Sequence, residues 1–329
     1  MAVSLRRLRN DALYFPVRAL FELGGRLPLP LLAALGAPLG RALLPLSRRD
    51  WQRATVHLAV AFPELDPAAR RRLLRRSATH LGRTLGEVIW LWRARAEQVV
   101  AACALSGLEH VERAFAAGRG AIFVTGHCGN WELLNARVGL AGVPLLVAVR
   151  ELFDPRFDQL VTDLRARFGV EVVARGAGAG RRLLRALGSN RLAGLLIDQD
   201  IRDIPGVFVP FFGRPAWTPS GAATLALRAG SPILPIFIHR RPDGSHLAEI
   251  QPPLPVPTTG ADGERVVELT AAATAAIERQ IRAHPEQWVW MHRRWRTRPE
   301  GELSAVSDQL SAPPPLPPSR GDGRGEADS

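Results

Sequence analysis

Between Ala121 and Gln251, short apolar segments alternate with longer amphipathic ones, and this alternation narrows the possible folds more than any other feature. Segments such as 121–125 (AIFVT) are too short for a helix and have the composition of buried strands. We predict strands at 121–125, 143–149, 170–174, 192–197, 233–239 and 245–251, and helices at 131–140, 157–168, 181–187 and 221–228. A turn at 241–244 joins the last two strands, and a helix at 264–283 follows. This order predicts an α/β fold, an open mixed sheet flanked by helices.

The first 50 residues have a different character and form a separate predicted segment, apolar and basic. The longest uncharged run, 27–40, is shorter than the roughly 20 residues of a membrane-spanning helix. Three prolines also lie in it: Pro28, Pro30 and Pro38. Because no clean cleavage site follows, a signal peptide is not expected. The segment favours an amphipathic helix lying in a membrane interface, and the alternative is an ordinary packed helix pair.

All 43 Lys and Arg residues are arginine, against 31 acids, which gives a net charge of +12 in 329 residues. Such an excess favours an anionic partner, which would be nucleic acid, an acidic protein or a membrane surface. The alternative is a compositional bias toward arginine. A helix predicted from Pro67 to Trp92, with Asp66 as its N-cap, carries arginines in its first half (Arg70, Arg71, Arg72, Arg75 and Arg76). They form either a docking face or a solvated one.

The remaining composition excludes several classes of protein. With 47% apolar residues the chain has enough material for a core, so wholesale disorder is excluded. Two cysteines, Cys103 and Cys128, cannot form a disulfide framework, which fits a reducing compartment. We expect residues 51–300 to form the main domain. Residues 301–329, rich in Pro, Ser, Gly and Asp, are expected to be a disordered tail.

The strongest chemical motif follows the first predicted strand and reads HCGNWE, from His127 to Glu132. A carboxylate bonded to one ring nitrogen of a histidine fixes its tautomer and leaves the other nitrogen free as a general base. We therefore expect Glu132 to hold His127. The alternative is a buried structural histidine satisfied by an acid. Cys128 is expected to be a small packing residue.

A second group of polar residues, Asp198-Gln199-Asp200, ends another predicted strand. Arg150 ends a neighbouring one, so it lies on the same edge of the sheet and is suited to a phosphate, or else to an ion pair with Asp198. The glycine-rich run 176–180 imitates a dinucleotide fingerprint, but Arg181 occupies the position of its third glycine. We interpret it as a flexible loop.

Tryptophan and arginine alternate near the C-terminal end, from Trp288 to Arg298. Such a mixture suits either single-stranded nucleic acid or a lipid headgroup zone. The segment by itself leaves both possibilities open.

Four blocks in order resemble the bacterial lipid A biosynthesis acyltransferases, within the lysophospholipid acyltransferase superfamily. They are HCGNWE at 127–132, DQD at 198–200, GVFVPFFG at 206–213 and the segment from Pro285-Glu-Gln to His292-Arg-Arg. The stretch through Ala61-Phe62-Pro63 is also similar, so the resemblance covers about residues 10–300.

The resemblance implies a glycerolipid acyltransferase-like fold and an enzyme on the cytoplasmic face of the inner membrane. The enzyme would move a fatty acyl chain from an acyl carrier protein thioester, or a CoA thioester, to a hydroxyl of a lipid A precursor. His127 would be the general base, Glu132 would orient it, and no metal or other cofactor is expected. Further positions expected to contact substrates are Gly129, Asn130, Arg150, Asp198, Gln199 and Asp200.

Two alternatives remain for the function. The first keeps the chemistry but changes the acceptor to a lysophospholipid or another polar lipid. The second is a non-catalytic basic module that binds a membrane or nucleic acid; the resemblance argues against it, and we expect no nucleic-acid partner.

Overall fold

The computed structural model describes residues 5–152 and 154–299, so the predicted tail at 301–329 lies outside the described residues. The predicted α/β fold is confirmed: a seven-stranded mixed sheet forms the centre of the molecule. Its strands in spatial order are β1 (Cys103–Ser106), β9 (His246–Ile250), β8 (Ile233–Arg240), β2 (Ala121–Thr125), β5 (Leu192–Leu196), β3 (Leu145–Val149) and β4 (Val170–Ala174). All neighbours are parallel except β8 and β9, which the predicted turn joins as an antiparallel pair.

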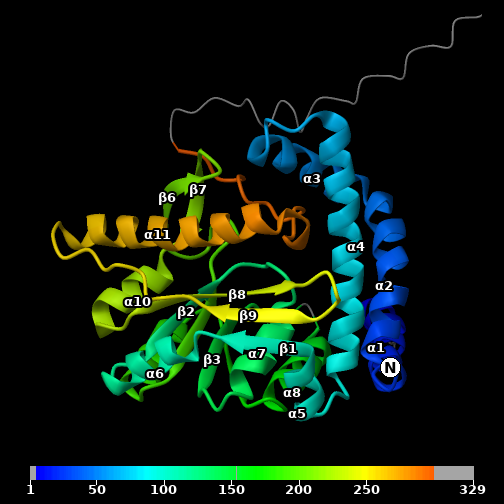
Figure 1. The fold of residues 1–329 in the computed structure, drawn as a ribbon, viewed down its shortest axis with the longest axis horizontal. Coiled ribbons are helices and arrows are strands. Elements are labelled where there is room, and N and C mark those ends of the chain that lie inside the picture. Colours follow the sequence, from blue (N-terminus) through cyan, green and yellow to red (C-terminus); the bar gives the residue numbers. More distant parts are fainter. Residues whose placement is uncertain (1–4, 153, 300–329) are drawn as a thin grey trace, which may run out of the picture.

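Helices cover both faces of the sheet (Figure 1). One face packs against α9 (Ala179–Gly188), α10 (Gly221–Ala229) and α11 (Asp262–Ala283). The other packs against α5 (Ala96–Ala102), α6 (Leu108–Ala116), α7 (Trp131–Gly139) and α8 (Pro155–Ala166). The buried side chains therefore form two apolar cores, one on each side of the sheet, as expected for strands that read as continuous apolar runs.

The long helix α4 (Pro67–Leu91) stands beside the sheet, and its start is capped by Asp66 as predicted. Outside it lie α1 (Leu5–Gly24) and α2 (Leu29–Leu43), with η1 (Leu44–Leu46) and α3 (Arg48–Ala61) leading back to α4 (Figure 1). Four glycines let α2 and α4 approach at backbone distance: a Cβ on Gly36 would lie 2.1 Å from the Gly82 oxygen, and one on Gly86 would lie 2.3 Å from the Leu32 oxygen. Gly40 packs against Gly82 in the same way.

With one face of α2 against α4, the opposite face is left open and apolar. Leu31, Leu35, Leu39 and Leu43 follow one another at four-residue intervals, and all are exposed. Leu13, Leu20 and Leu23 extend the apolar surface onto α1. Within the described residues, one segment, Leu29–Leu46, is long and apolar enough to cross a membrane. The α2 helix continues through Pro38, so the prolines interrupt it less than the sequence suggested.

The tryptophan-rich segment is packed in the interior, which corrects both expectations for it. Trp288 and Trp290 are fully buried, and Arg294 is 0% exposed with its guanidinium donating to the Trp217 oxygen at 2.7 Å. They pack against the hairpin of β6 (Gly206–Phe211) and β7 (Arg214–Pro219), which the sequence analysis did not assign. The tryptophans after η2 (Pro285–Gln287) therefore belong to the core, and the segment presents no row of exposed tryptophans to nucleic acid or headgroups, although Arg293 and Arg296 are exposed.

The glycine contact between α2 and α4 gives the first testable prediction. Gly36→Ala should lower the free energy of unfolding by about 1–3 kcal/mol, because the added methyl group overpacks a backbone contact. Gly263→Ala, on α11 where a Cβ meets nothing within 4 Å, is the matched control and should be neutral or slightly stabilising. Urea unfolding of the detergent-solubilised protein measures both. Equal stability of the two variants would show that α2 does not depend on this close packing.

Candidate active site

The register of the central strands brings His127 and Asp198 together. Thr125 on β2 lies opposite Leu196 on β5, and each chain continues two residues beyond that pair. The two continuations end at His127 and Asp198, whose side chains meet with Nδ1 of His127 2.7 Å from Oδ1 of Asp198. Parallel strands deliver both residues to the carboxyl edge of the sheet, where ligands of open α/β folds bind.

The Asp198 carboxylate is completely engaged by N–H donors. Its Oδ2 accepts from the backbone N–H of His127 at 2.7 Å and from the indole of Trp288 at 2.8 Å. Burial alone would raise the pKa of Asp198, but the neighbouring His127 and the hydrogen bonds hold that pKa below its ordinary value. Asp198 is therefore a buried, ionised partner that fixes the ring of His127.

Glu132 does not hold His127, contrary to the prediction. It lies in the first turn of α7, and its carboxylate faces α8, where Arg165 donates to it through Nε at 2.9 Å and through a terminal nitrogen at 2.6 Å. The spacing of five residues does bring the two side chains close together, since both His127 and Glu132 line one pocket. The helix turn, however, directs Glu132 away from the His127 ring and into a bidentate ion pair.

The free side of the His127 ring faces Gln199 and His292. The Gln199 amide nitrogen lies 3.2 Å from Nε2 of His127 and 3.2 Å from Nδ1 of His292. His292 meets His127 edge to face, with ring centroids 4.6 Å apart, and burial lowers the pKa of His292 to about 4. His292 is therefore neutral at physiological pH. In the sequence, His292 stands out only as part of the block from Pro285 to Arg294 that resembles the family, and that block was the signal for it.

His127, Asp198 and His292 also offer the donor atoms of a metal site, all within 4.8 Å of one another. Both oxygens of Asp198, however, already accept hydrogen bonds from nitrogen donors. We interpret the group as an acid–base cluster.

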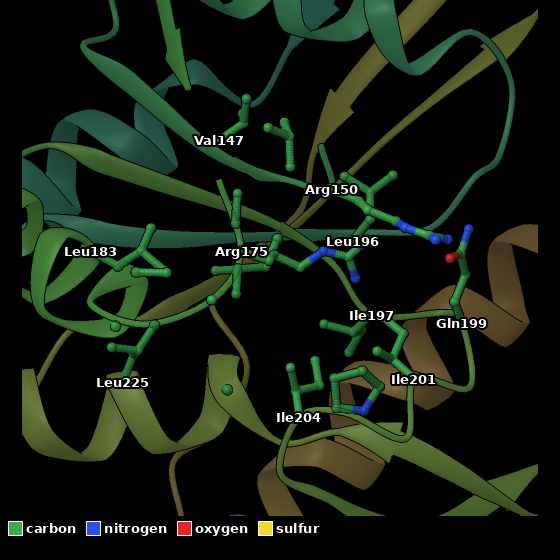
Figure 2. Close-up of a pocket in the computed structure, with 18 of the residues that line it drawn as sticks. Val147, Arg150, Arg175, Leu183, Leu196, Ile197, Gln199, Ile201, Ile204 and Leu225 are labelled. Carbon is green, nitrogen blue, oxygen red and sulfur yellow. The ribbon is translucent and has the colours of Figure 1, made fainter. Parts of the chain in front are cut away.

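A pocket of about 920 Å³ opens beside His127 (Figure 2). Its deeper walls are apolar and come from strands β3 and β5 and helices α9 and α10; they include Val147, Leu183, Leu196, Ile197 and Leu225. Its polar wall carries Gln199, Arg150 and the Glu132–Arg165 pair. The volume lies in the range of small-molecule sites, and the division into a polar end and an apolar depth suits an amphiphile.

The other predicted contact residues have distinct places. Gln199 and Arg150 line the pocket, and Arg150 makes no ion pair with Asp198. Asp200 is turned away: its carboxylate accepts from the Thr297 hydroxyl at 2.8 Å and pairs with Arg296 at 3.6 Å, which fixes the end of the tryptophan-rich segment. The glycine-rich loop 176–180 lines the pocket and leads into α9.

Gly129 and Asn130 shape the loop between β2 and α7. Gly129 has a φ of +62°, and a Cβ there would lie 2.3 Å from the Ile238 oxygen, so only glycine fits. Asn130 caps α7 by accepting from the Leu133 N–H at 3.0 Å. Its amide nitrogen donates to Glu87 at 2.9 Å. Both residues support the loop that carries His127, and neither lines the pocket.

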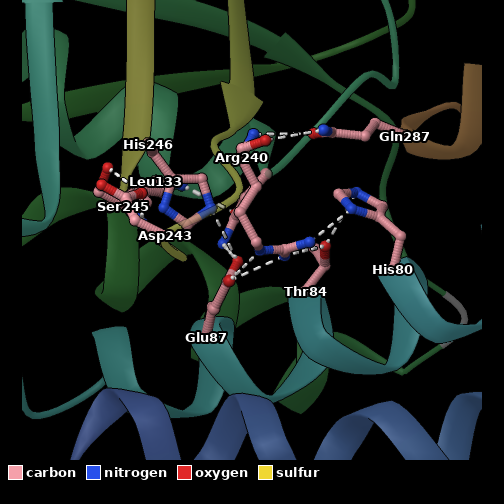
Figure 3. A network of polar contacts seen from close by, with 10 residues as sticks. His80, Thr84, Glu87, Leu133, Arg240, Asp243, Ser245, His246 and Gln287 are labelled. Carbon is pink, nitrogen blue, oxygen red and sulfur yellow. Dashed lines mark hydrogen bonds and ion pairs between the residues drawn. The ribbon is translucent and has the colours of Figure 1, made fainter. Parts of the chain in front are cut away.

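Glu87 is the centre of a buried polar network behind this loop (Figure 3). It lies on α4 and is 2% exposed, and Arg240 on β8 donates to it at 2.8 Å. Arg240 also donates to Thr84 and His80, one and two turns before Glu87 on α4, while its backbone is bonded to the Gln287 side chain. Burial alone would raise the pKa of Glu87, but His246 and Arg240 lower it to about 2. The network ties α4 to the sheet and to the His127 loop.

Removing one member of this network should be costly. Glu87→Ala leaves the Arg240 guanidinium buried without its carboxylate and should lower the free energy of unfolding by about 3–5 kcal/mol. Glu97→Ala, which removes an exposed carboxylate 4.0 Å from Arg95, is the matched control and should change it by less than about 0.5 kcal/mol. Denaturant unfolding compares the two. A loss below about 1 kcal/mol in Glu87→Ala would mean that water satisfies Arg240 instead.

Known proteins resemble this chain over most of its length. Residues 4–297 match the family model of the bacterial lipid A biosynthesis acyltransferases. The chain is 30% identical over 282 residues to the lipid A biosynthesis lauroyltransferase of Escherichia coli K12, covering 84% of this chain and 89% of that protein. It is 28% identical over 283 residues to the palmitoleoyltransferase of the same organism, with 85% and 89% covered.

A more distant match is the phosphatidylinositol mannoside acyltransferase of Mycobacterium tuberculosis, 29% identical over 194 residues, or 58% of this chain and 59% of that protein. All of these relatives are acyltransferases. The family match spans the N-terminal helices, the sheet with its His127–Asp198 pair and the buried tryptophan segment. The chain therefore belongs to the bacterial lipid A biosynthesis acyltransferase family and is an acyltransferase.

Proposed function

We propose that the protein transfers a fatty acyl chain from the thioester of acyl carrier protein to a hydroxyl of a lipid A precursor, at the cytoplasmic face of the inner membrane. The observation that carries the proposal is the His127–Asp198 pair beside a pocket with an apolar depth. The names of the relatives supply the acceptor class, a lipid A precursor.

The ionised Asp198 fixes the N–H of His127 on Nδ1, which leaves Nε2 as a free base. The Gln199 amide nitrogen lies 3.2 Å from Nε2 in this structure, so an acceptor hydroxyl would take its place when the substrate binds. His127 takes the hydroxyl proton as the oxygen attacks the thioester carbonyl. The C–S bond then breaks, the ester C–O bond remains, and the proton passes from His127 to the departing thiolate.

Asp198 stabilises the imidazolium that exists between these two proton transfers, since its negative charge is buried and close. The neutral His292 adds no competing positive charge beside that imidazolium. The Glu132–Arg165 pair has a positioning role in this mechanism: it holds α7 to α8 and forms the polar wall of the pocket.

The exposed leucines of α1 and α2 support attachment to a membrane. Burial of apolar surface contributes roughly 25 cal/mol per Å², so a ridge of leucines on neighbouring helices favours a lipid phase. With α2 either crossing or lying in the interface, the rest of the domain stays next to the lipid that it acylates.

Acyl carrier protein is an acidic partner, and α4 offers a basic surface close to the site. Arg71, Arg72, Arg75 and Arg76 are exposed. Arg76 pairs with Glu286 at 3.6 Å, and the next residue, Ser77, donates to the Trp288 oxygen at 3.2 Å. This surface therefore adjoins the segment that leads to His292, so a carrier docked on it would lie near the reacting groups.

The catalytic proposal predicts the behaviour of two variants. His127→Ala and Asp198→Asn should each lower kcat by about two to four orders of magnitude. The first variant removes the base, and in the second the side chain at 198 no longer holds the N–H of His127 on Nδ1. Mass spectrometry of the lipid formed from acyl carrier protein thioester and a tetra-acylated lipid A precursor measures the rate. Asp203→Asn, an exposed acid in the loop after the site, is the control and should keep normal activity.

The outcomes of this assay are separable. Normal turnover by Asp198→Asn would contradict its role as the partner of His127. If the acyl thioester is consumed with a lysophospholipid or another polar lipid, but not with the lipid A precursor, the acyl-transfer mechanism stands and the proposed acceptor is wrong. Unchanged lipid A acylation in a deletion strain would point the same way.

The carrier proposal predicts a different kinetic change. The combined variant Arg71→Gln, Arg72→Gln and Arg75→Gln should raise the KM for the carrier thioester more than it lowers kcat, and added salt should reduce the difference from the wild type. A control with the same loss of charge, Arg113→Gln, Arg119→Gln and Arg185→Gln, removes exposed arginines that lie outside α4. Equal KM values in the two triple variants would leave overall charge as the whole effect.

A further inference from the structure

The pocket beside His127 has an excess of positive charge that its own acids do not balance. Five arginines line it: Arg150, Arg165, Arg175, Arg181 and Arg228. The acids in its lining are Glu132, which is paired with Arg165, and Asp158, whose carboxylate lies 3.4 Å from the Leu152 N–H. Of the remaining arginines, Arg175 is half-buried and the other three are exposed, so together they give a mainly apolar pocket a positively charged wall.

Strand register places two of these arginines side by side. Val149 on β3 lies opposite Ala174 on β4, and Arg150 and Arg175 are the next residue on each strand. The backbone N–H of Arg175 donates to the Val149 oxygen at 2.8 Å, so the pairing continues to this point. Figure 2 shows both side chains in the pocket, with Arg150 reaching toward Gln199.

Neither guanidinium has a hydrogen-bond or ion-pair partner within residues 5–152 and 154–299. Burial, and then the charge of Arg150, lower the pKa of Arg175, as expected for two positive groups that follow paired residues of adjacent strands. Two like charges held together in this way are stabilised when an anion lies between them.

We propose that Arg150 and Arg175 form a phosphate-binding subsite between the His127 end and the apolar depth of the pocket. A phosphate presents several acceptor oxygens to the planar forks of two guanidinium groups, a geometry that a single ammonium would not match. The subsite rests on the proposed function for its source: the phosphate belongs either to a phosphorylated glycolipid acceptor or to the phosphopantetheine arm of the donor.

A binding experiment without turnover tests the subsite itself. The probes are 4′-phosphopantetheine and glucosamine 1-phosphate, each compared with its phosphate-free counterpart, pantetheine or glucosamine, by isothermal titration calorimetry. Wild-type protein should bind each phosphate probe more tightly than its counterpart. Arg150→Gln and Arg175→Gln should each weaken phosphate binding about ten- to a hundredfold. Arg185→Gln, an exposed arginine of α9 outside the pocket lining, should bind like the wild type.

Kinetics then distinguish the two sources. If the phosphate belongs to the acceptor, both variants raise the KM for a phosphorylated lipid A precursor and leave the KM for a dephosphorylated one unchanged. If it belongs to the donor, they raise the KM for the carrier thioester and leave that for an acyl-pantetheine without phosphate unchanged. Arg150→Lys and Arg175→Lys, which keep the charge but lose the planar fork, should be intermediate.

Two results would overturn the subsite: no preference of the wild-type protein for the phosphate probes up to about 10 mM, or equal binding by wild type, Arg150→Gln and Arg175→Gln. Arginine-dependent phosphate binding by a protein that transfers no acyl group would instead keep the subsite and refute the proposed function. The two failures are therefore distinguishable.

Discussion

The structure of the site depends on one buried carboxylate. Asp198 accepts hydrogen bonds from the ring and backbone of His127 and from the indole of Trp288. These donors come from the loop after β2 and from the C-terminal segment, while Asp198 itself follows β5. An ionised group without solvent is stable only when donors surround it, so the charge of Asp198 requires three distant parts of the chain to meet at one point.

A second buried charge has the same effect one layer further out. Glu87 holds Arg240 of β8 and Asn130 of the His127 loop, and so attaches α4 to the sheet. The glycine-mediated contact then attaches α2, with its exposed leucines, to α4. A continuous series of contacts therefore leads from the apolar N-terminal helices to the loop that carries His127. These contacts fix the orientation of the pocket beside His127 relative to the exposed leucines of α1 and α2.

Much of this arrangement could be predicted from the sequence, because parallel strands place their carboxyl ends along one edge. The strands before His127, Arg150 and Asp198 were recognisable as short apolar runs, and their order gave the fold class. The partner of His127 was not recognisable: Glu132 is close in sequence, whereas Asp198 is close only through the register of β2 with β5. The spacing of two residues along the chain indicates whether they can be neighbours within one helix or loop. The pairing of residues on different strands depends on the register of the sheet, which becomes known only with the fold. The buried role of Trp288 and Trp290 was missed for the same reason, since packing against the β6–β7 hairpin leaves no local pattern.

The charge of +12 separates into groups with different physical roles. Arg240, Arg165 and Arg294 are engaged by carboxylates, carbonyls or hydroxyls in the interior, so they serve the fold. The exposed arginines of α4 lie on the surface, where they act at long range and are screened by salt. Arg150 and Arg175 form a third group, because both line the pocket, one exposed and the other half-buried, and neither has a counter-charge among the described residues. The anion that we propose for this pair would also carry an apolar chain, because the rest of the pocket lining is mainly apolar. Those two properties describe the amphiphilic substrates of an acyltransferase more closely than net charge alone would.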